Sequence, residues 1–202
     1  MKKKPRKPNA EYKLKPADLS LTTRRVLSLD PGSRNMGISC VGVDKKDRIQ
    51  VLANSILTNP ITHLTSGFHA SLLVYLKEVD RWVRMYQPHG LVMERFQTRG
   101  TGGPLIELVS VMIGSICTAY KHLPCKMIVA SQWKNQFHRR FEHELDAIYR
   151  ELLVTPHQLD SSLIGCYGLE AGLRRELRYS PESIVRKVEA SSLLPLRNRR
   201  IK

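Results

Sequence analysis

Short apolar runs separated by turn residues fill the first part of the chain after its basic start. Three such runs cover residues 26–29, 36–43 and 49–57. Residues 31–35, Pro-Gly-Ser-Arg-Asn, join the first two runs, and the charged segment 44–47 joins the second to the third. Both connections have the composition of tight turns. We therefore predict three strands that form an antiparallel meander.

Farther along the chain the apolar spacing becomes that of helices alternating with short strands. One buried helical face is expected over residues 66–86, where apolar residues recur at steps of three and four: Phe68, Leu72, Leu76, Val79, Val83 and Tyr86. Strands are expected over 91–94 and 125–130, and further helices over 104–121, 141–153 and 156–172. The predicted order, βββ-α-β-α-β-α-α, indicates an α/β domain with a five-stranded mixed sheet flanked by helices.

Composition divides the chain into one domain and two basic tails. Residues 1–23 are rich in Lys and Pro and lack hydrophobic periodicity, so we expect a flexible basic arm. The domain spans 24–172, and a basic extension covers 173–202. No apolar stretch follows the basic start, so a secretory signal is not expected. The sequence contains no run of 18 apolar residues, so no membrane-spanning helix is expected either.

Positive charge dominates the composition. The chain carries 33 Lys and Arg against 18 Asp and Glu, a formal net charge of +15. Lysine and arginine bind polyanions by displacing counterions from phosphates, so a nucleic acid is the expected partner. An anionic membrane surface, or a basic face that serves only solubility, are the alternatives.

The cysteines show no spacing typical of a metal site. Cys40, Cys117, Cys125 and Cys166 lie in apolar stretches and form no CxxC pair. We expect reduced, buried thiols in a reducing compartment, and no zinc site.

Acidic residues end apolar stretches that lie far apart in the chain. Asp30 closes the first run, Glu94 closes the fourth, and Asp160 lies near the start of the last predicted helix. His157 precedes Asp160 by three positions, so the two side chains share a helix face. If the first and fourth strands are neighbours, Asp30 and Glu94 end side by side.

Carboxylates that converge from different elements are ligands that magnesium prefers. Two such ions can activate a water molecule and stabilise the leaving oxygen of a phosphodiester. The pattern therefore indicates a metal site formed by Asp30, Glu94, His157 and Asp160 in an enzyme that cuts nucleic acid. Each residue alone has an ordinary alternative: a plain turn for Asp30, a surface acid for Glu94, the helix dipole for Asp160, and a structural or solvated imidazole for His157.

The segments around these residues resemble the RuvC family of Holliday-junction resolvases, within the RNase H-like superfamily, whose order of elements is the one predicted above. The matching segments are Val26-Leu-Ser-Leu-Asp-Pro-Gly-Ser-Arg-Asn-Met-Gly-Ile-Ser39, Leu91-Val-Met-Glu-Arg-Phe96 and His157-Gln-Leu-Asp-Ser-Ser-Leu-Ile-Gly165. The resemblance covers roughly residues 25–170. It implies a homodimer in which each subunit nicks one of two opposed strands of a four-way DNA junction with Mg²⁺ or Mn²⁺, leaving 5′-phosphates.

The same resemblance assigns roles to residues. It makes Asp30, Glu94, His157 and Asp160 the catalytic set that holds two metal ions, and the family has an acid or His at the position of His157. Lys134 resembles a family lysine near the scissile phosphate, where it would stabilise developing charge; an ordinary surface lysine is the alternative. Members of the family often carry an aromatic residue that wedges the centre of the junction, at the position that is Gln97 in this chain. Phe96, one residue earlier, either takes that role or belongs to the core.

Basic and aromatic side chains near the motifs are the expected DNA contacts. They are Arg95, Phe96, Arg99, Lys134, Arg139 and Arg140, and a solvated basic face is the alternative for the arginines. The helix over 104–121 is apolar around much of its circumference, so both of its sides need cover. One side would pack on the sheet, and a twofold contact with a second copy, or the basic C-terminal segment, would cover the other.

The sequence therefore predicts a metal-dependent endonuclease that resolves four-way DNA junctions. A less selective nuclease of the same fold, acting on branched DNA or RNA–DNA hybrids, and a non-catalytic nucleic-acid-binding protein are the alternatives. Residues 138–155 and the tails depart from the bacterial pattern, so we expect a divergent relative such as a viral one. Its expected location is the cytoplasm, that of the host for a virus-encoded protein, although the Lys-rich start also resembles a nuclear import signal.

Overall fold

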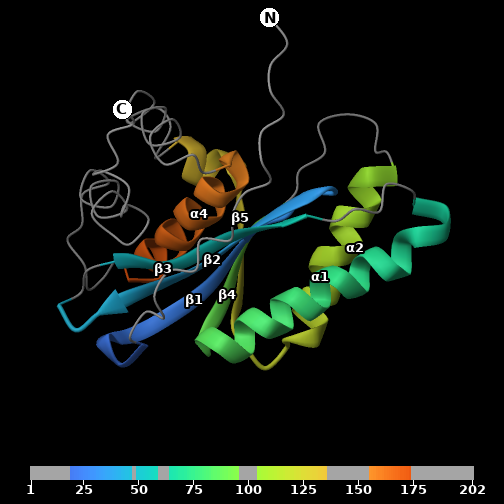
Figure 1. Cartoon of the computed structure of the whole chain (residues 1–202). Coiled ribbons are helices and arrows are strands. Elements are labelled where there is room, and N and C mark those ends of the chain that lie inside the picture. Colours follow the sequence, from blue (N-terminus) through green and yellow to red (C-terminus); the bar gives the residue numbers. More distant parts are fainter. Residues whose placement is uncertain (1–18, 47–48, 59–63, 96–103, 136–154, 174–202) are drawn as a thin grey trace, which may run out of the picture.

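The computed structural model describes residues 19–46, 49–58, 64–95, 104–135 and 155–173. A five-stranded sheet of order β3-β2-β1-β4-β5 lies between helices on its two faces (Figure 1). Its elements, in chain order, are η1 (Leu19–Leu21), β1 (Thr22–Asp30), β2 (Asn35–Asp44), β3 (Ile49–Thr58), α1 (Leu64–Tyr86), β4 (Gly90–Arg95), α2 (Pro104–Ala119), β5 (Cys125–Val129) and α4 (Pro156–Leu173). Residues 130–135 are also helical.

The architecture confirms the predicted five-stranded mixed sheet and its RNase H-like order. β1, β2 and β3 form the antiparallel meander, while β4 pairs in parallel with β1 on one side and with β5 on the other. The strand β1 begins at Thr22, which is buried, so the folded part starts slightly before the predicted domain boundary at residue 24. The helix predicted over 141–153 lies outside the described residues.

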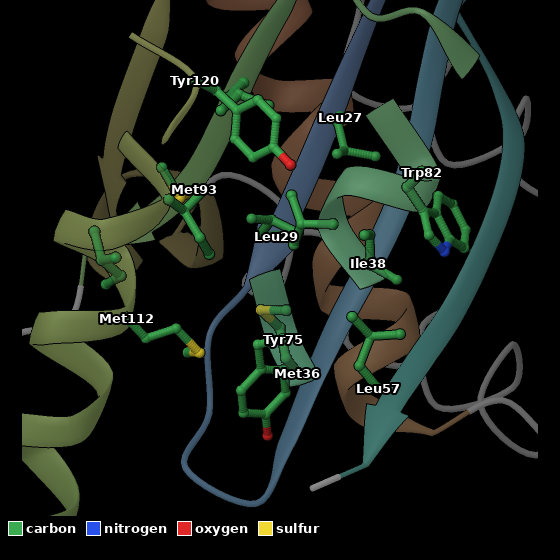
Figure 2. Packing of buried hydrophobic residues seen from close by; sticks show 14 of the residues in the cluster. Leu27, Leu29, Met36, Ile38, Leu57, Tyr75, Trp82, Met93, Met112 and Tyr120 are labelled. Carbon is green, nitrogen blue, oxygen red and sulfur yellow. The ribbon is translucent and has the colours of Figure 1, made fainter. Parts of the chain in front are cut away.

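The two faces of the sheet carry separate hydrophobic cores. α1 and α2 cover one face, and α4 covers the other (Figure 1). Figure 2 shows the core beneath α1 and α2, where Leu27 and Leu29 of β1 meet Trp82 of α1 and Met112 of α2. Because successive side chains of a strand point to opposite faces, Val26 of β1 instead joins the core beneath α4.

The face of α4 that packs on the sheet carries small residues, which lets the helix approach the strands closely. A Cβ atom added at Gly165 would lie 2.6 Å from the hydroxyl of Ser28 on β1. Near the start of the helix, the hydroxyls of Ser161 and Ser162 lie 2.7 and 2.9 Å from that of Ser39 on β2. These buried hydrogen bonds tie the first turns of α4 to the middle of the sheet.

The helix α2 was predicted to be apolar around much of its circumference, with one side on the sheet and the other in need of cover. Its apolar residues Leu108, Val109, Met112, Ile113 and Ile116 are buried. On the outer face, Ser110, Val111, Gly114 and Thr118 are exposed. These positions fall together on one side of the helix, so the described residues leave that side uncovered, and its cover by a second copy or by the C-terminal segment stays a prediction.

The expectation that every cysteine is a buried thiol was wrong. Cys40 and Cys166 are buried, but Cys117 is only partly buried and Cys125 is exposed. Cys125 is the first residue of β5, the last strand of the described sheet on that side, and its apolar neighbours in the sequence do not cover it. Among the described residues, no helix has both the length and the apolar character needed to cross a membrane.

Candidate active site

The parallel pairing of β1 and β4 brings two acids to one edge of the sheet. Leu29 on β1 lies opposite Met93 on β4, so Asp30 and Glu94 are the next residues along the two strands. Leu29 and Met93 both point into the core beneath α1 and α2. Alternation therefore directs the carboxylates of Asp30 and Glu94 to the opposite face, the one that α4 covers.

The first turn of α4 places His157 against Asp30. Its Nδ1 atom lies 2.6 Å from Oδ2 of Asp30. A carboxylate only accepts hydrogen bonds, so Nδ1 carries the hydrogen in this pair and Nε2 is the other ring nitrogen. The hydrogen bond to Asp30 is the largest cause that raises the pKa of His157, and the charges of Asp30 and Asp160 act in the same direction against burial and Lys134.

A glycine of β2 permits this placement. Gly37 pairs with Asp30 across the β1–β2 ladder. A Cβ atom at Gly37 would lie 1.9 Å from the backbone oxygen of His157, a distance that no side chain can occupy. Only glycine therefore lets the start of α4 reach the end of β1.

The carboxylate of Glu94 accepts a hydrogen bond from the indole of Trp133. Trp133 is fully buried, and its Nε1–H donates to Oε2 of Glu94 at 2.9 Å. Burial is the largest cause that raises the pKa of Glu94, and the charges of Asp30 and Asp160 add to it. Lys134 and the Trp133 hydrogen bond act in the opposite direction.

Asp160 faces Lys134 at the same edge. The Nζ atom of Lys134 lies 3.5 Å from Oδ2 of Asp160 and 4.9 Å from the centre of the Trp133 ring. Lys134 belongs to the helical residues 130–135 that directly follow β5. The indole and the ammonium thus reach the site from adjacent positions on one segment.

The site therefore joins all five residues that were predicted to be catalytic, through direct contacts and mutual electrostatic effects. Trp133 was missed as a functional residue, although it lies beside Lys134 in the sequence. Arg95 is exposed at the end of β4, on the opposite side of the strand from Glu94. The other expected DNA contacts, Phe96, Arg99, Arg139 and Arg140, lie outside the described residues.

The donor set fits a hard divalent cation, because it supplies three carboxylates and an imidazole. Within the described part of the chain, no three His, Cys, Asp or Glu side chains surround a common point as metal ligands would. Each acid instead contacts a protein group: His157 for Asp30, Trp133 for Glu94 and Lys134 for Asp160. Magnesium is commonly held by one or two carboxylates together with water and substrate phosphates, so a complete protein cage is not required.

The fold and this edge define an RNase H-like α/β domain with a carboxylate, histidine and lysine site. No family model matches the chain. In sequence, the crossover junction endodeoxyribonuclease RuvC of Pseudarthrobacter chlorophenolicus is 35% identical over 74 residues, which cover 36% of this chain and 36% of that protein. The sequence match thus spans about a third of the curated relative.

Solved structures of Thermus thermophilus RuvC extend the likeness to most of the domain. RuvC in complex with a Holliday junction substrate has a TM-score of 0.58 at 17% identity, over 75% of this chain and 95% of that chain. A second RuvC structure has a TM-score of 0.59 at 16% identity, over 74% of this chain and 96% of that chain. The chain is therefore similar to RuvC in sequence over one segment and in fold over most of the domain.

Proposed function

We propose that this chain is a metal-dependent endonuclease that resolves four-way DNA junctions by paired nicks in opposed strands. The observation that carries the proposal is the meeting of Asp30, Glu94, His157 and Asp160 at one edge of the sheet, with their charges acting on one another. The net charge of +15 supports a nucleic-acid substrate. The likeness to RuvC, one structure of which holds a Holliday junction, supports a branched one.

Asp30, Glu94, His157 and Asp160 would hold Mg²⁺ or Mn²⁺, two ions per site. Bound there, the ions would supply a nucleophilic water and would stabilise the leaving oxygen of the phosphodiester. The hydrogen bond from Trp133 to Oε2 holds the carboxylate of Glu94 in place. Asp30 fixes the ring of His157 through Nδ1, which leaves Nε2 to bind a ligand or accept a proton.

Lys134 supplies positive charge to the site. Its ammonium neutralises part of the charge of Asp160 in the free protein. Beside a scissile phosphate it would stabilise the negative charge that develops in the transition state. Because the adjacent Trp133 is fully buried, the backbone segment that carries Lys134 is anchored beside the site.

Two nicks in opposed strands require two active sites. We assign the second site to a second copy of the chain, bound through the exposed face of α2. There Val111 is 45% exposed, and no atom of the described residues lies within 4 Å of the Cβ position of Gly114. A glycine on a helix surface allows another helix to approach closely. A twofold contact of this kind places the two sites symmetrically, as a symmetric junction requires.

The test compares the native chain with Asp30→Asn on a panel of labelled substrates: a four-way junction, a flap, an RNA–DNA hybrid and a linear duplex. The native chain should cut the junction at paired sites in Mg²⁺, leave 5′-phosphates and stop when EDTA is added. Asp30→Asn keeps the size of the side chain but loses its charge, so it should bind the junction with unchanged Kd and fail to cut it.

The other outcomes identify the rival functions. Equal cutting of flap, hybrid and junction would mean a less selective nuclease. An absence of metal-dependent cutting on every substrate, with binding retained, would mean a non-catalytic binding protein. Cutting by Asp30→Asn at the native rate would remove Asp30 from the catalytic set.

A further inference from the structure

Two thiols lie together at the end of the sheet where β5 begins. Cys117 belongs to the last turn of α2, and Cys125 is the first residue of β5. Their Sγ atoms are 3.5 Å apart, within the range of an S–H···S hydrogen bond. The remaining cysteines, Cys40 and Cys166, are fully buried in the two separate cores.

The pair is open to small molecules. Cys125 is exposed and lines a pocket of about 370 Å³, together with Pro124, Lys126 and Arg24. The pKa of the Cys125 thiol is raised to about 12. Partial burial of the sulfur is the largest cause, and its hydrogen bond with Cys117 is the second. The Cys125 thiol is therefore protonated at neutral pH, and its S–H hydrogen can occupy the space between the two sulfurs.

The connection between the two cysteines holds them in place. It is a short turn in which the backbone nitrogen of Leu123 donates to the oxygen of Tyr120 at 2.8 Å. Leu91 of β4 donates its N–H to the oxygen of Pro124, also at 2.8 Å, which anchors the start of β5. Since a disulfide has an S–S length of about 2.05 Å, the sulfurs must approach by about 1.5 Å, a movement that rotation of two side chains can supply.

We propose that Cys117 and Cys125 are a redox-active pair that hydroperoxides convert to a disulfide. Cys117, as its thiolate, attacks the peroxide O–O bond to give a sulfenic acid and release water or an alcohol. The other thiol then attacks the sulfenic sulfur, the S–S bond forms, and the hydroxyl leaves as water. In total two thiols lose two electrons and two protons, and the hydroperoxide is reduced.

The proposal is independent of nuclease activity, because the pair lies near the start of β5 while Trp133 and Lys134 follow its end. The disulfide would join the last turn of α2 covalently to the neighbouring edge strand. A thiol reductant would reverse the reaction, since disulfide exchange restores both thiols.

The sequence makes the test simple, because trypsin cuts between the two cysteines at Lys121. Cys117 falls in the peptide 100–121 and Cys125 in the peptide 122–126. The reduced, full-length chain is treated with hydrogen peroxide, unfolded in N-ethylmaleimide and digested. We expect the two peptides to appear joined, with two hydrogens fewer than their sum, and to separate on addition of dithiothreitol, while Cys40 and Cys166 carry the maleimide.

Controls come from the same face of the protein. Met127 on β5 is 52% exposed, so its sulfoxide reports that peroxide has reached this surface. The variants Cys117→Ser and Cys125→Ser should each leave the remaining thiol of the pair without an intramolecular disulfide. Maleimide on both Cys117 and Cys125 after oxidation of Met127, or a disulfide between chains in place of the internal one, would overturn the proposal.

Discussion

Nδ1 of His157 lies 2.6 Å from Oδ2 of Asp30, although 127 positions separate the two residues in the chain. The contact requires that β1 ends beside the first turn of α4. It also requires glycine at position 37 of the neighbouring strand β2, because a side chain there would collide with His157. It holds the ring of His157 in place, and it is the largest cause that raises the pKa of His157. The two side chains are therefore held together as one unit at the edge of the sheet.

The side chain of His157 should be replaceable by an acid but not by alanine. His157→Ala removes a ligand and proton acceptor, so the rate of junction cutting at saturating Mg²⁺ should fall by roughly 10²-fold. His157→Asp supplies carboxylate oxygens at the same place and should retain a larger part of the rate. Single-turnover nicking of a labelled junction measures both; equal rates for the two variants would contradict a direct role at the metal site.

Removal of the charge of Glu94 should stabilise the metal-free protein while it abolishes cutting. A carboxyl group whose pKa is raised by folding binds its proton more tightly in the folded state, so its stabilising contribution is present at low pH and is lost as the pH rises through the raised pKa. In EDTA at pH 7, Glu94→Gln should therefore raise Tm by about 2 °C, a small change because solvent partly screens the group.

The difference in Tm between Glu94→Gln and the native protein should disappear at about pH 4, where the native Glu94 also carries its proton. Glu107 on α2 is exposed and offers a matched control. Glu107→Gln should change Tm little at either pH, since surface substitutions are usually small in effect. Thermal unfolding followed by circular dichroism measures all three proteins, and a lower Tm for Glu94→Gln at pH 7 would mean that Glu94 stabilises the fold.

An alanine at position 37 should disable the site without removing any catalytic side chain. Its Cβ would lie 1.9 Å from the oxygen of His157, so α4 must move away from β2. We expect a loss of stability of about 1–3 kcal/mol and a fall in cutting beyond the loss of folded protein. Gly90 is the control, since its added Cβ would meet Pro124 at 3.0 Å, at the opposite end of the sheet. Gly90→Ala should still cut, and equal activity per folded molecule in both variants would contradict the positioning role of Gly37.

A charge on the outer face of α2 should separate the proposed dimer. Val111→Lys places an ammonium in the contact between two copies, where it would lose water without gaining a partner. Light scattering should show a monomer, and on a four-way junction single nicks should replace paired ones. Val74→Lys on α1, where the native residue is 38% exposed, is the matched control and should remain dimeric. A dimer that survives Val111→Lys would place the interface elsewhere.

Most of the architecture followed from local patterns in the chain. The alternating runs predicted the meander, the spacing over 66–86 predicted α1, and Pro156 marked the first residue of α4. The parallel pairing that sets Asp30 beside Glu94 was only a condition in the prediction, because a strand's neighbour depends on contacts between segments distant in sequence. The exposure of Cys125 was missed for the same reason, since a hydrophobic run in the sequence does not show which other segments will cover it.

The sequence by itself determined the identity of the candidate residues: three acids at the ends of apolar segments, a histidine one helical turn before the last acid, and a lysine after the fifth strand. The tertiary structure decided their partners. Burial of Trp133 gives Glu94 its hydrogen bond, Gly37 gives His157 its place against Asp30, and the turn after α2 brings Cys117 within 3.5 Å of Cys125. Such contacts depend on close packing between segments, which a linear pattern of polar and apolar residues does not contain.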